Sequence, residues 1–120
     1  MTGKADMSEF DIWMEIVQEE KKYFDSYEKY ARKIKEVLER ELESVRVFVF
    51  GSVVEVKHTP ASDIDVLAVS TNMPRGMKRA ELRGKVLREI GVFSPFEIHL
   101  ADEKEFEWYR RFAEKMIEIE

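Results

Sequence analysis

The fold is decided by two segments, Val45-Arg46-Val47-Phe48-Val49-Phe50-Gly51-Ser52 and, ten residues later, Asp63-Ile64-Asp65-Val66-Leu67-Ala68-Val69. The first is rich in β-branched and aromatic residues and ends at Gly51-Ser52, which predicts a buried strand followed by a tight turn. The second predicts another strand, with two acidic residues at its start. Residues 52–62 contain Pro60 and are predicted to form the loop between the two strands.

Upstream of these strands, apolar residues recur every three or four positions from residue 13 to residue 42, which is the period of a helix with one buried face. No proline or glycine interrupts residues 8–44. One straight helix of that length would be about 50 Å long, more than a domain of this size is wide. We therefore expect a break, with a second helix starting at Asp25-Ser26. Without a break, the apolar stripe would have to be buried by another chain.

Downstream, residues 77–90 are predicted to form a helix that Gly91 ends. Residues 94–100 alternate between apolar and polar and predict a third strand. Asp102 and Glu105 form a capping-box pattern that starts a last helix, which is expected to bury Phe112 and to continue through Met116-Ile117. The predicted fold class is α+β, a small mixed sheet flanked by helices with a long N-terminal helical region.

The composition limits the classes of function. A chain of 120 residues allows one domain, which we divide into a helical region at 8–44 and a catalytic core at 45–120. The absence of cysteine excludes disulfides, cysteine-ligated zinc and a thiol nucleophile. No apolar run approaches the roughly 20 residues of a membrane span, and the N-terminus lacks an apolar signal core, so we expect a cytoplasmic protein.

The charge pattern adds two expectations. The net charge of −5 argues against a general nucleic-acid-binding protein. Residues 75–89 nevertheless hold six basic and two acidic residues, so this helix could meet phosphates or an acidic partner, although a solvated helix face is the simpler explanation. Glutamine and asparagine occur once each while charged residues abound, which favours a thermophilic source.

Gly51-Ser52 and the acidic pair carry the chemistry. Gly51 lets the backbone approach a ligand closely, and free N–H groups of a turn at Ser52 would form a phosphate cradle. Asp63 and Asp65 are two residues apart on a strand and so point to the same face. Two neighbouring carboxylates repel each other unless a divalent cation such as Mg²⁺ lies between them. Each motif alone also occurs in turns and ion pairs, and it is their combination that indicates a site.

Glu97 supplies a third carboxylate on the next predicted strand, with Phe96, Ile98 and Leu100 on the opposite face. Three acids on adjacent strands could hold two metal ions, and Glu97 could also accept the proton of the attacking hydroxyl. His99 lies on the face of Glu97 and could bind metal or phosphate, although an ordinary polar strand residue is the simpler interpretation.

The motif Val49-Phe50-Gly51-Ser52 … Ser62-Asp63-Ile64-Asp65-Val66 resembles the signature of the polymerase-β-like nucleotidyltransferase superfamily. In its short length, the chain resembles the minimal nucleotidyltransferases, which are often paired with HEPN-domain proteins in toxin–antitoxin systems. The resemblance covers roughly residues 28–115. Many minimal members have an Arg-Gly pair soon after Gly-Ser, where this chain has Val53-Val54-Glu55.

The resemblance implies that Gly51, Ser52 and Ser62 bind a nucleoside triphosphate, with ATP as the first choice. It assigns Mg²⁺ binding and catalysis to the acids, Asp63, Asp65 and Glu97. The implied reaction transfers a nucleoside monophosphate to a hydroxyl, in the toxin–antitoxin branch a tyrosine of the HEPN partner. The alternative is a non-catalytic module that binds a partner or senses nucleotide, and the N-terminal stripe also allows a homodimer.

Overall fold

The computed structural model describes residues 8–51, 53–54 and 63–120. Their helices and strands follow in the order α1 (Glu9–Asp25), α2 (Tyr27–Glu39), β1 (Arg46–Phe50), β2 (Ile64–Val69), α3 (Met77–Ile90), β3 (Phe96–Ala101), α4 (Glu103–Phe112) and β4 (Met116–Ile119). The predicted α+β class is confirmed. Within the described ranges, no helix is both long and apolar enough to cross a bilayer.

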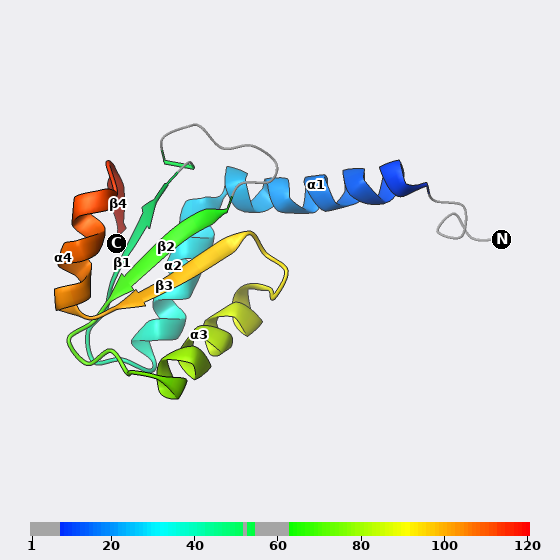
Figure 1. The fold of residues 1–120 in the computed structure, drawn as a ribbon. Helices are drawn as coiled ribbons and strands as arrows, with labels where there is room; N and C mark the ends of the chain where they lie inside the picture. The colour runs from blue at the N-terminus through cyan, green and yellow to red at the C-terminus, as the bar shows by residue number, and fades with distance from the viewer. Residues whose placement is uncertain (1–7, 52, 55–62) are drawn as a thin grey trace.

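The four strands form one mixed sheet in the order β3-β2-β1-β4 (Figure 1). β1 is antiparallel to both β2 and β4. β2 and β3 are parallel, joined through α3, and their register places Asp65 opposite Glu97. The start of β2 and β3 therefore meets the end of β1, where Phe50 and Gly51 lie.

The C-terminal strand corrects the sequence prediction, which continued the last helix through Met116-Ile117. α4 ends at Phe112, and Ala113 already has an extended backbone. Residues 116–119 instead pair with β1, where Ile119 lies opposite Val47. The apolar strand β1 would otherwise present an unpaired edge, and pairing it with β4 satisfies its backbone groups. Phe112, expected to be buried, is 66% exposed.

The break in the N-terminal helical region lies where it was predicted. α1 ends at Asp25, and Ser26 is both the C-cap of α1 and the N-cap of α2. α1 starts with a capping box in which the Ser8 hydroxyl accepts from the Asp11 N–H at 3.2 Å. The helix projects away from the sheet (Figure 1), and the molecule measures 55 × 29 × 24 Å.

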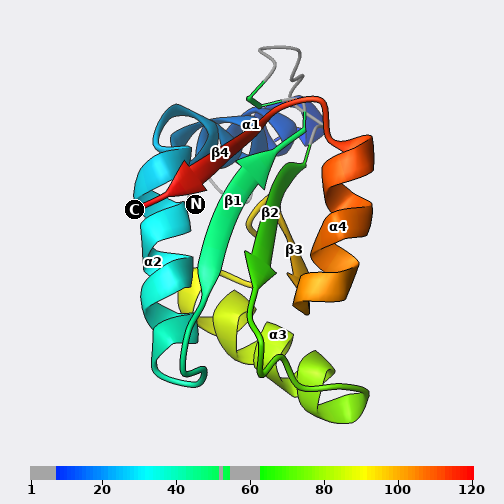
Figure 2. The ribbon, with the colours of Figure 1, turned by 90° about the vertical axis from the view of Figure 1, so that its left-hand side faces the viewer.

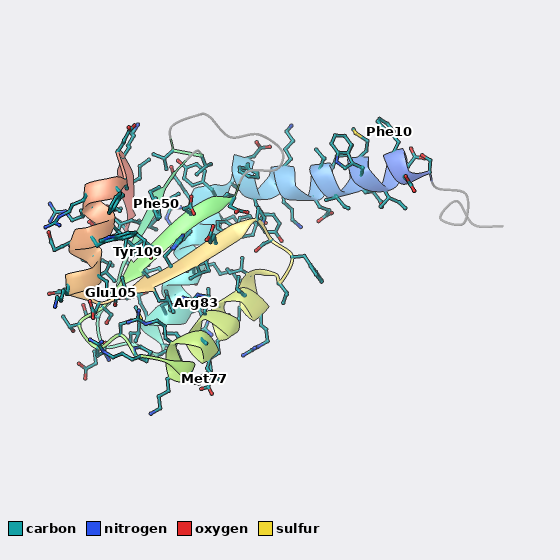
Figure 3. The ribbon with its side chains drawn as sticks, in the orientation of Figure 1. Phe10, Phe50, Met77, Arg83, Glu105 and Tyr109 are labelled. Atoms are coloured by element: carbon teal, nitrogen blue, oxygen red, sulfur yellow. The ribbon has the colours of Figure 1, made fainter. Side chains whose placement is uncertain are left out.

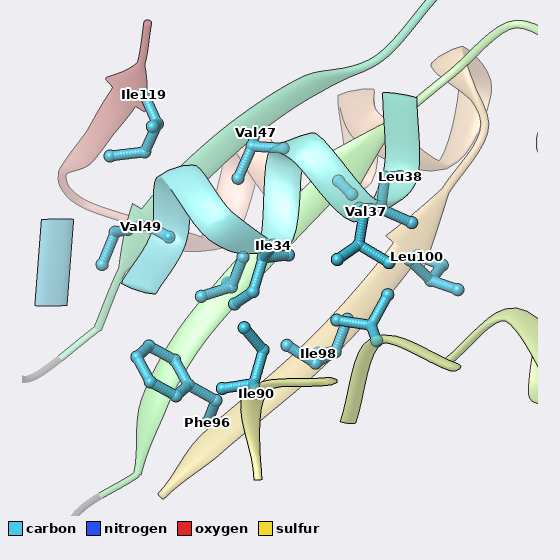
Figure 4. Close-up of a cluster of buried hydrophobic side chains, with 14 of the residues drawn as sticks. Ile34, Val37, Leu38, Val47, Val49, Ile90, Phe96, Ile98, Leu100 and Ile119 are labelled. Atoms are coloured by element: carbon cyan, nitrogen blue, oxygen red, sulfur yellow. The ribbon is translucent and has the colours of Figure 1, made fainter. Parts of the chain in front are cut away.

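The two faces of the sheet are covered differently. α2 and α3 cover one face and bury a continuous apolar core with residues such as Ile34, Leu38 and Val47 (Figure 4). α4 lies on the other face (Figure 2), where a smaller cluster forms around Phe48, Leu67, Val69, Ala101 and Phe106. Because β3 and β4 are at opposite edges, the chain must cross this second face between them. Its crossing places α4 beside the polar residues described next.

Candidate active site

Asp65, Glu97 and His99 form the central cluster of the second face. Side chains alternate between faces along a strand, so the register of β2 and β3 brings these three together on the side of α4. One ligand atom from each lies within 4.8 Å of the other two. His99 Nε2 is 3.2 Å from Asp65 Oδ1 and 3.8 Å from Glu97 Oε1. The side chains of Asp65 and His99 are about three-quarters buried, whereas that of Glu97 is 55% exposed.

Gly51 is required by the position of Asp65. Its backbone has φ +83°, and a Cβ built there would collide with Asp65 Oδ2. The sequence predicted that Gly51 lets the backbone approach a ligand, and that stays a prediction; among the described atoms, the group nearest to the Cβ position of Gly51 is the carboxylate of Asp65. Any other residue at position 51 would require the Asp65 carboxylate to shift.

His99 lies between two polar partners. Its Nδ1 is 3.3 Å from the Tyr109 hydroxyl, while Nε2 faces Asp65. With its hydrogen on Nε2, the neutral ring donates to Asp65 and accepts from Tyr109. With its hydrogen on Nδ1, the ring donates to the Tyr109 oxygen, and the Nε2 lone pair faces the two carboxylates. The Tyr109 hydroxyl both donates and accepts, so it suits either tautomer.

The Tyr109 hydroxyl lies in an apolar and partly acidic environment. Its ring contacts Phe50 and His99, with ring centroids 6.2 and 5.6 Å away. Burial raises the pKa of Tyr109, and the nearby charge of Glu105 raises it further. Tyr109 therefore stays protonated at neutral pH and keeps the hydrogen that it shares with His99.

An ion pair beneath this site joins α3 to α4. Both guanidinium Nη atoms of Arg79 donate to the Glu105 carboxylate at 3.0 Å, and Nη1 also donates to the carbonyl of Leu100. Arg79 lowers the pKa of Glu105 to about 2. The pair holds the first turn of α4 against the end of β3, which fixes the helix that carries Tyr109.

The basic residues of α3 mostly have structural partners. Arg79 pairs with Glu105, and Lys85 pairs with Glu41 at 3.2 Å. Arg83 donates from Nε to the carbonyl of Ile98 at 2.9 Å, at the edge of the sheet. These contacts favour a role in holding α3 to its neighbours over a free phosphate-binding surface.

The structure gathers only part of the predicted set. Asp65 and Glu97 meet, whereas Asp63 is exposed just before β2 and is not in the three-residue cluster. Ser52 and Ser62 lie outside the described residues. His99 and Tyr109 were not assigned to the site from the sequence. The alternation Glu97-Ile98-His99 was the signal for the first, and nothing local distinguished Tyr109 from a core residue.

The donor set fits a divalent cation. Two carboxylates supply the oxygen ligands that Mg²⁺ and Mn²⁺ prefer, and an imidazole also suits transition metals. His99 has the second hydrogen-bond partner that a metal-binding histidine needs to keep its ring in place, the Tyr109 hydroxyl. The carboxylates of Asp65 and Glu97 both lie close to the imidazole of His99, at 3.2 and 3.8 Å from its Nε2.

A pocket of about 510 Å³ opens beside this cluster. It is lined by Phe50, Gly51, Asp65, His99, Trp108, Tyr109, Phe112, Ala113 and Glu114. Figure 3 shows Phe50 of β1 and Tyr109 of α4 on the same side of the sheet. A larger hollow of about 730 Å³ lies between α1 and the turn after α3, and its lining includes none of the three clustered residues. The chemistry and the smaller pocket coincide, as expected of a substrate site.

Comparisons with known proteins bear on this site. The model of the nucleotidyltransferase domain family matches residues 31–119. The chain is similar to a crystal structure provisionally described as a nucleotidyltransferase, with 31% identity, a TM-score of 0.64 and coverage of 74% of this chain and 96% of the other. It shares the fold of a second such protein, from Sulfolobus solfataricus, with 19% identity, a TM-score of 0.61 and coverage of 81% and 82%. None of the curated proteins compared with the sequence matches it.

Proposed function

Because the chain belongs to the nucleotidyltransferase domain family, we propose that it transfers a nucleoside monophosphate from a nucleoside triphosphate to a hydroxyl group and releases pyrophosphate. ATP is the proposed donor. The observation that carries this proposal is the cluster of Asp65, Glu97 and His99 beside Gly51, because the ligand atoms lie within 4.8 Å of one another and next to a pocket. Family membership supplies the reaction type, and the cluster supplies the groups that could perform it.

The cluster would hold Mg²⁺ through Asp65 and Glu97, with His99 as a further ligand. A bound Mg²⁺ would neutralise phosphate charge and lower the pKa of the attacking hydroxyl. Glu97 is the more exposed carboxylate, so it is the better placed to accept the hydroxyl proton. Asp65 contacts His99 Nε2 through Oδ1, and its side chain is about three-quarters buried, which suits a positioning role. A second cation would require Asp63 to join the cluster.

The test is a transfer assay with ATP labelled at the α-phosphate, with a HEPN-domain protein and a cell extract as acceptor sources. We expect Mg²⁺-dependent labelling by the wild type. The Asp65→Asn variant should lose at least about 10³-fold in rate, because several kcal/mol of charge stabilisation would be removed. Glu107→Gln is the matched control, since Glu107 lies on the exposed side of α4 and pairs with Arg110. Equal labelling by the wild type and Asp65→Asn would contradict the proposal.

We further propose that the acceptor is a tyrosine of a HEPN-domain toxin and that the chain acts as its antitoxin. The support is an exposed apolar row on α1, where Phe10, Trp13 and Ile16 are each at least half exposed. A projecting helix with such a row needs a partner, which a second copy of the chain would also provide. The row equally favours a second candidate function, a module that binds its partner without catalysis.

Size-exclusion chromatography with light scattering separates these cases. The wild type and a Trp13→Ser variant would be run alone and with the HEPN-domain protein. A complex that Trp13→Ser weakens supports the partner proposal, and a concentration-dependent dimer of the wild type supports self-association. A monomer that binds no HEPN-domain protein would contradict both roles of α1 and leave the transfer assay unaffected.

A further inference from the structure

We infer that the pocket beside the cluster, formed where α4 faces β1 and β2, binds the base of a purine nucleoside triphosphate. This inference rests on the proposed function, since it assigns a place to one part of the proposed substrate. The pocket shares Gly51, Asp65 and His99 with the cluster. A nucleotide whose phosphates reach the cluster therefore has its uncharged part within reach of this pocket.

Away from the cluster, the lining of the pocket is unsuited to phosphates. Its described residues include no lysine or arginine, and they include the carboxylate of Glu114. An anion beyond the reach of a cation held by Asp65 and Glu97 would meet the Glu114 carboxylate without a compensating positive charge from this lining. The remaining lining is mostly aromatic, which suits a flat and uncharged ring system.

Two large aromatic side chains of the pocket, those of Trp108 and Phe112, are more than half exposed. Trp108 is 56% exposed and Phe112 is 66% exposed. They are one helical turn apart on α4, with ring centroids 4.5 Å apart and an interplanar angle of 45°. Phe106 packs against Phe48 in the core instead, with centroids 5.0 Å apart. Trp108 and Phe112 are thus not needed for the core and offer a platform on which a base can stack.

The edge of the pocket distinguishes between bases. Glu114 is exposed and, within the described residues, makes no hydrogen bond or ion pair. An ionised carboxylate only accepts hydrogen bonds, so it favours a base edge that carries N–H donors. Adenine presents its amino group, and guanine presents two neighbouring N–H groups. Uracil presents one N–H group between two carbonyl oxygens that Glu114 repels, and its single ring stacks over a smaller area.

The experiment uses the two tryptophans of the chain, Trp13 on α1 and Trp108 in the pocket. A Trp13→Phe variant leaves Trp108 as its only tryptophan and makes fluorescence a reporter of the pocket. In Mg²⁺, ATP and GTP should quench this fluorescence at lower concentration than UTP, and inorganic tripolyphosphate should change it little. Calorimetry then compares Trp108→Ala with the control Phe93→Ala, since Phe93 is an exposed aromatic residue outside the lining of this pocket.

We expect Trp108→Ala to weaken ATP binding by roughly 5- to 150-fold, the range found when a stacking ring is removed. Phe93→Ala should leave it unchanged, and neither variant should change tripolyphosphate binding. Glu114→Gln should reduce the preference for ATP over UTP. Circular dichroism checks that Trp108→Ala is folded, and Phe112→Ala provides a second variant of the same platform.

The outcomes separate this inference from the proposed function. If ATP binding requires Mg²⁺ and Asp65 but is the same in Trp108→Ala and wild type, the base lies elsewhere and the inference is overturned while the transferase proposal stands. If Trp108→Ala instead raises only the KM of the hydroxyl acceptor, the pocket holds the acceptor, which also overturns the inference. If the wild type binds no nucleotide, both proposals fail.

Discussion

The two faces of the sheet are built from alternate residues of the same strands and have different tasks. On the face of α2 and α3, Ile64, Val66 and Ala68 are fully buried in the main core. On the face of α4, Asp65 lies at the open end of β2, while Leu67 is fully buried beneath the helix. A strand with a period of two can thus serve stability on one side and chemistry on the other.

The comparison also explains why α4 is a single short helix. Two helices cover the core face and exclude water from it, whereas α4 covers only part of the other face (Figure 2). The uncovered part holds Asp65, Glu97 and His99, which the proposed function requires to be accessible to a substrate. Incomplete coverage is therefore part of how the site is made.

The largest expected effect is on the free energy of unfolding, when a buried leucine is truncated on each face of the sheet. Leu38 and Leu67 are both fully buried, the first in the core face and the second beneath α4. We expect Leu38→Ala to lower the free energy of unfolding by about 3–5 kcal/mol and Leu67→Ala by about 2–3 kcal/mol, because the smaller cluster can collapse more easily around a cavity. Urea denaturation measures both. The reverse order would show that the α4 face contributes more to stability than its size suggests.

A substitution at Gly51 tests the close approach between the turn after β1 and the Asp65 carboxylate of the cluster. Gly51→Ala adds a Cβ that collides with Asp65 and places alanine at φ +83°. We expect a loss of about 2–4 kcal/mol in the free energy of unfolding, together with weaker Mn²⁺ binding measured by electron paramagnetic resonance.

Gly76→Ala is the matched control, since Gly76 has φ +61° but open space around its Cβ position. With ψ at −132°, Gly76 lies outside the left-handed helical region, so this variant should show the backbone strain alone, about 1–3 kcal/mol. Combining Gly51→Ala with Asp65→Ala should recover part of the lost stability, because the collision is removed. Equal costs for Gly51→Ala and Gly76→Ala would contradict the role assigned to Asp65.

A pH titration tests the attachment of α4. The folded-state pKa of Glu105 is about 2, below the ordinary value of 4.5, because Arg79 favours its charged form. Its contribution is therefore complete above pH 4.5 and is lost as the pH falls from 4.5 towards 2. Since the Glu105 side chain is 44% exposed, solvent screening limits this contribution to about 1 kcal/mol.

Glu105→Gln should remove the part of the acid-induced loss of stability that Glu105 causes, as measured by thermal melts between pH 3 and pH 6. Glu107→Gln serves as its control, because the Glu107–Arg110 pair is exposed on both sides. An unchanged pH dependence in Glu105→Gln would mean that the Arg79–Glu105 pair does not contribute to the stability of the fold.

The smallest effect on the free energy of unfolding is expected for a substitution in the acidic cluster, at Asp65. Asp65→Asn keeps the shape of the side chain and an oxygen that can accept from His99 Nε2–H. Its free energy of unfolding should stay within about 0.5 kcal/mol of the wild type, even though the transfer activity is lost. A loss above 1 kcal/mol would indicate that Asp65 supports the fold as well as the proposed chemistry.

Local patterns predicted most of the elements. The strands at β1, β2 and β3, the helix α3 and the break at Ser26 lie within a few residues of their predicted positions. These elements are encoded by short-range periodicity, capping residues and glycine. The fourth strand was missed because Met116–Ile119 is too short to reveal a period. Its extended conformation is decided by the edge of β1, far away in the sequence.

The candidate site was predicted only in part, and for a related reason. The sequence places two acids before and within one strand and a third acid on another, without stating which of them meet. Register decided that Asp65 joins Glu97 and His99, because parallel pairing sets these residues opposite or diagonal to one another. Asp63 precedes the paired region and so is not placed by the register.

By itself, the sequence determined the fold class, the polar and apolar sides of each strand, and the acidic character of the site, since each of these follows from residues close together along the chain. The tertiary structure alone decided which acids cluster, that Gly51 faces Asp65, and that Tyr109 and Trp108 of α4 border the cluster. These features depend on the pairing of β2 with β3 and on the passage of α4 from one edge of the sheet to the other. Both join residues distant in the sequence, which no local pattern records.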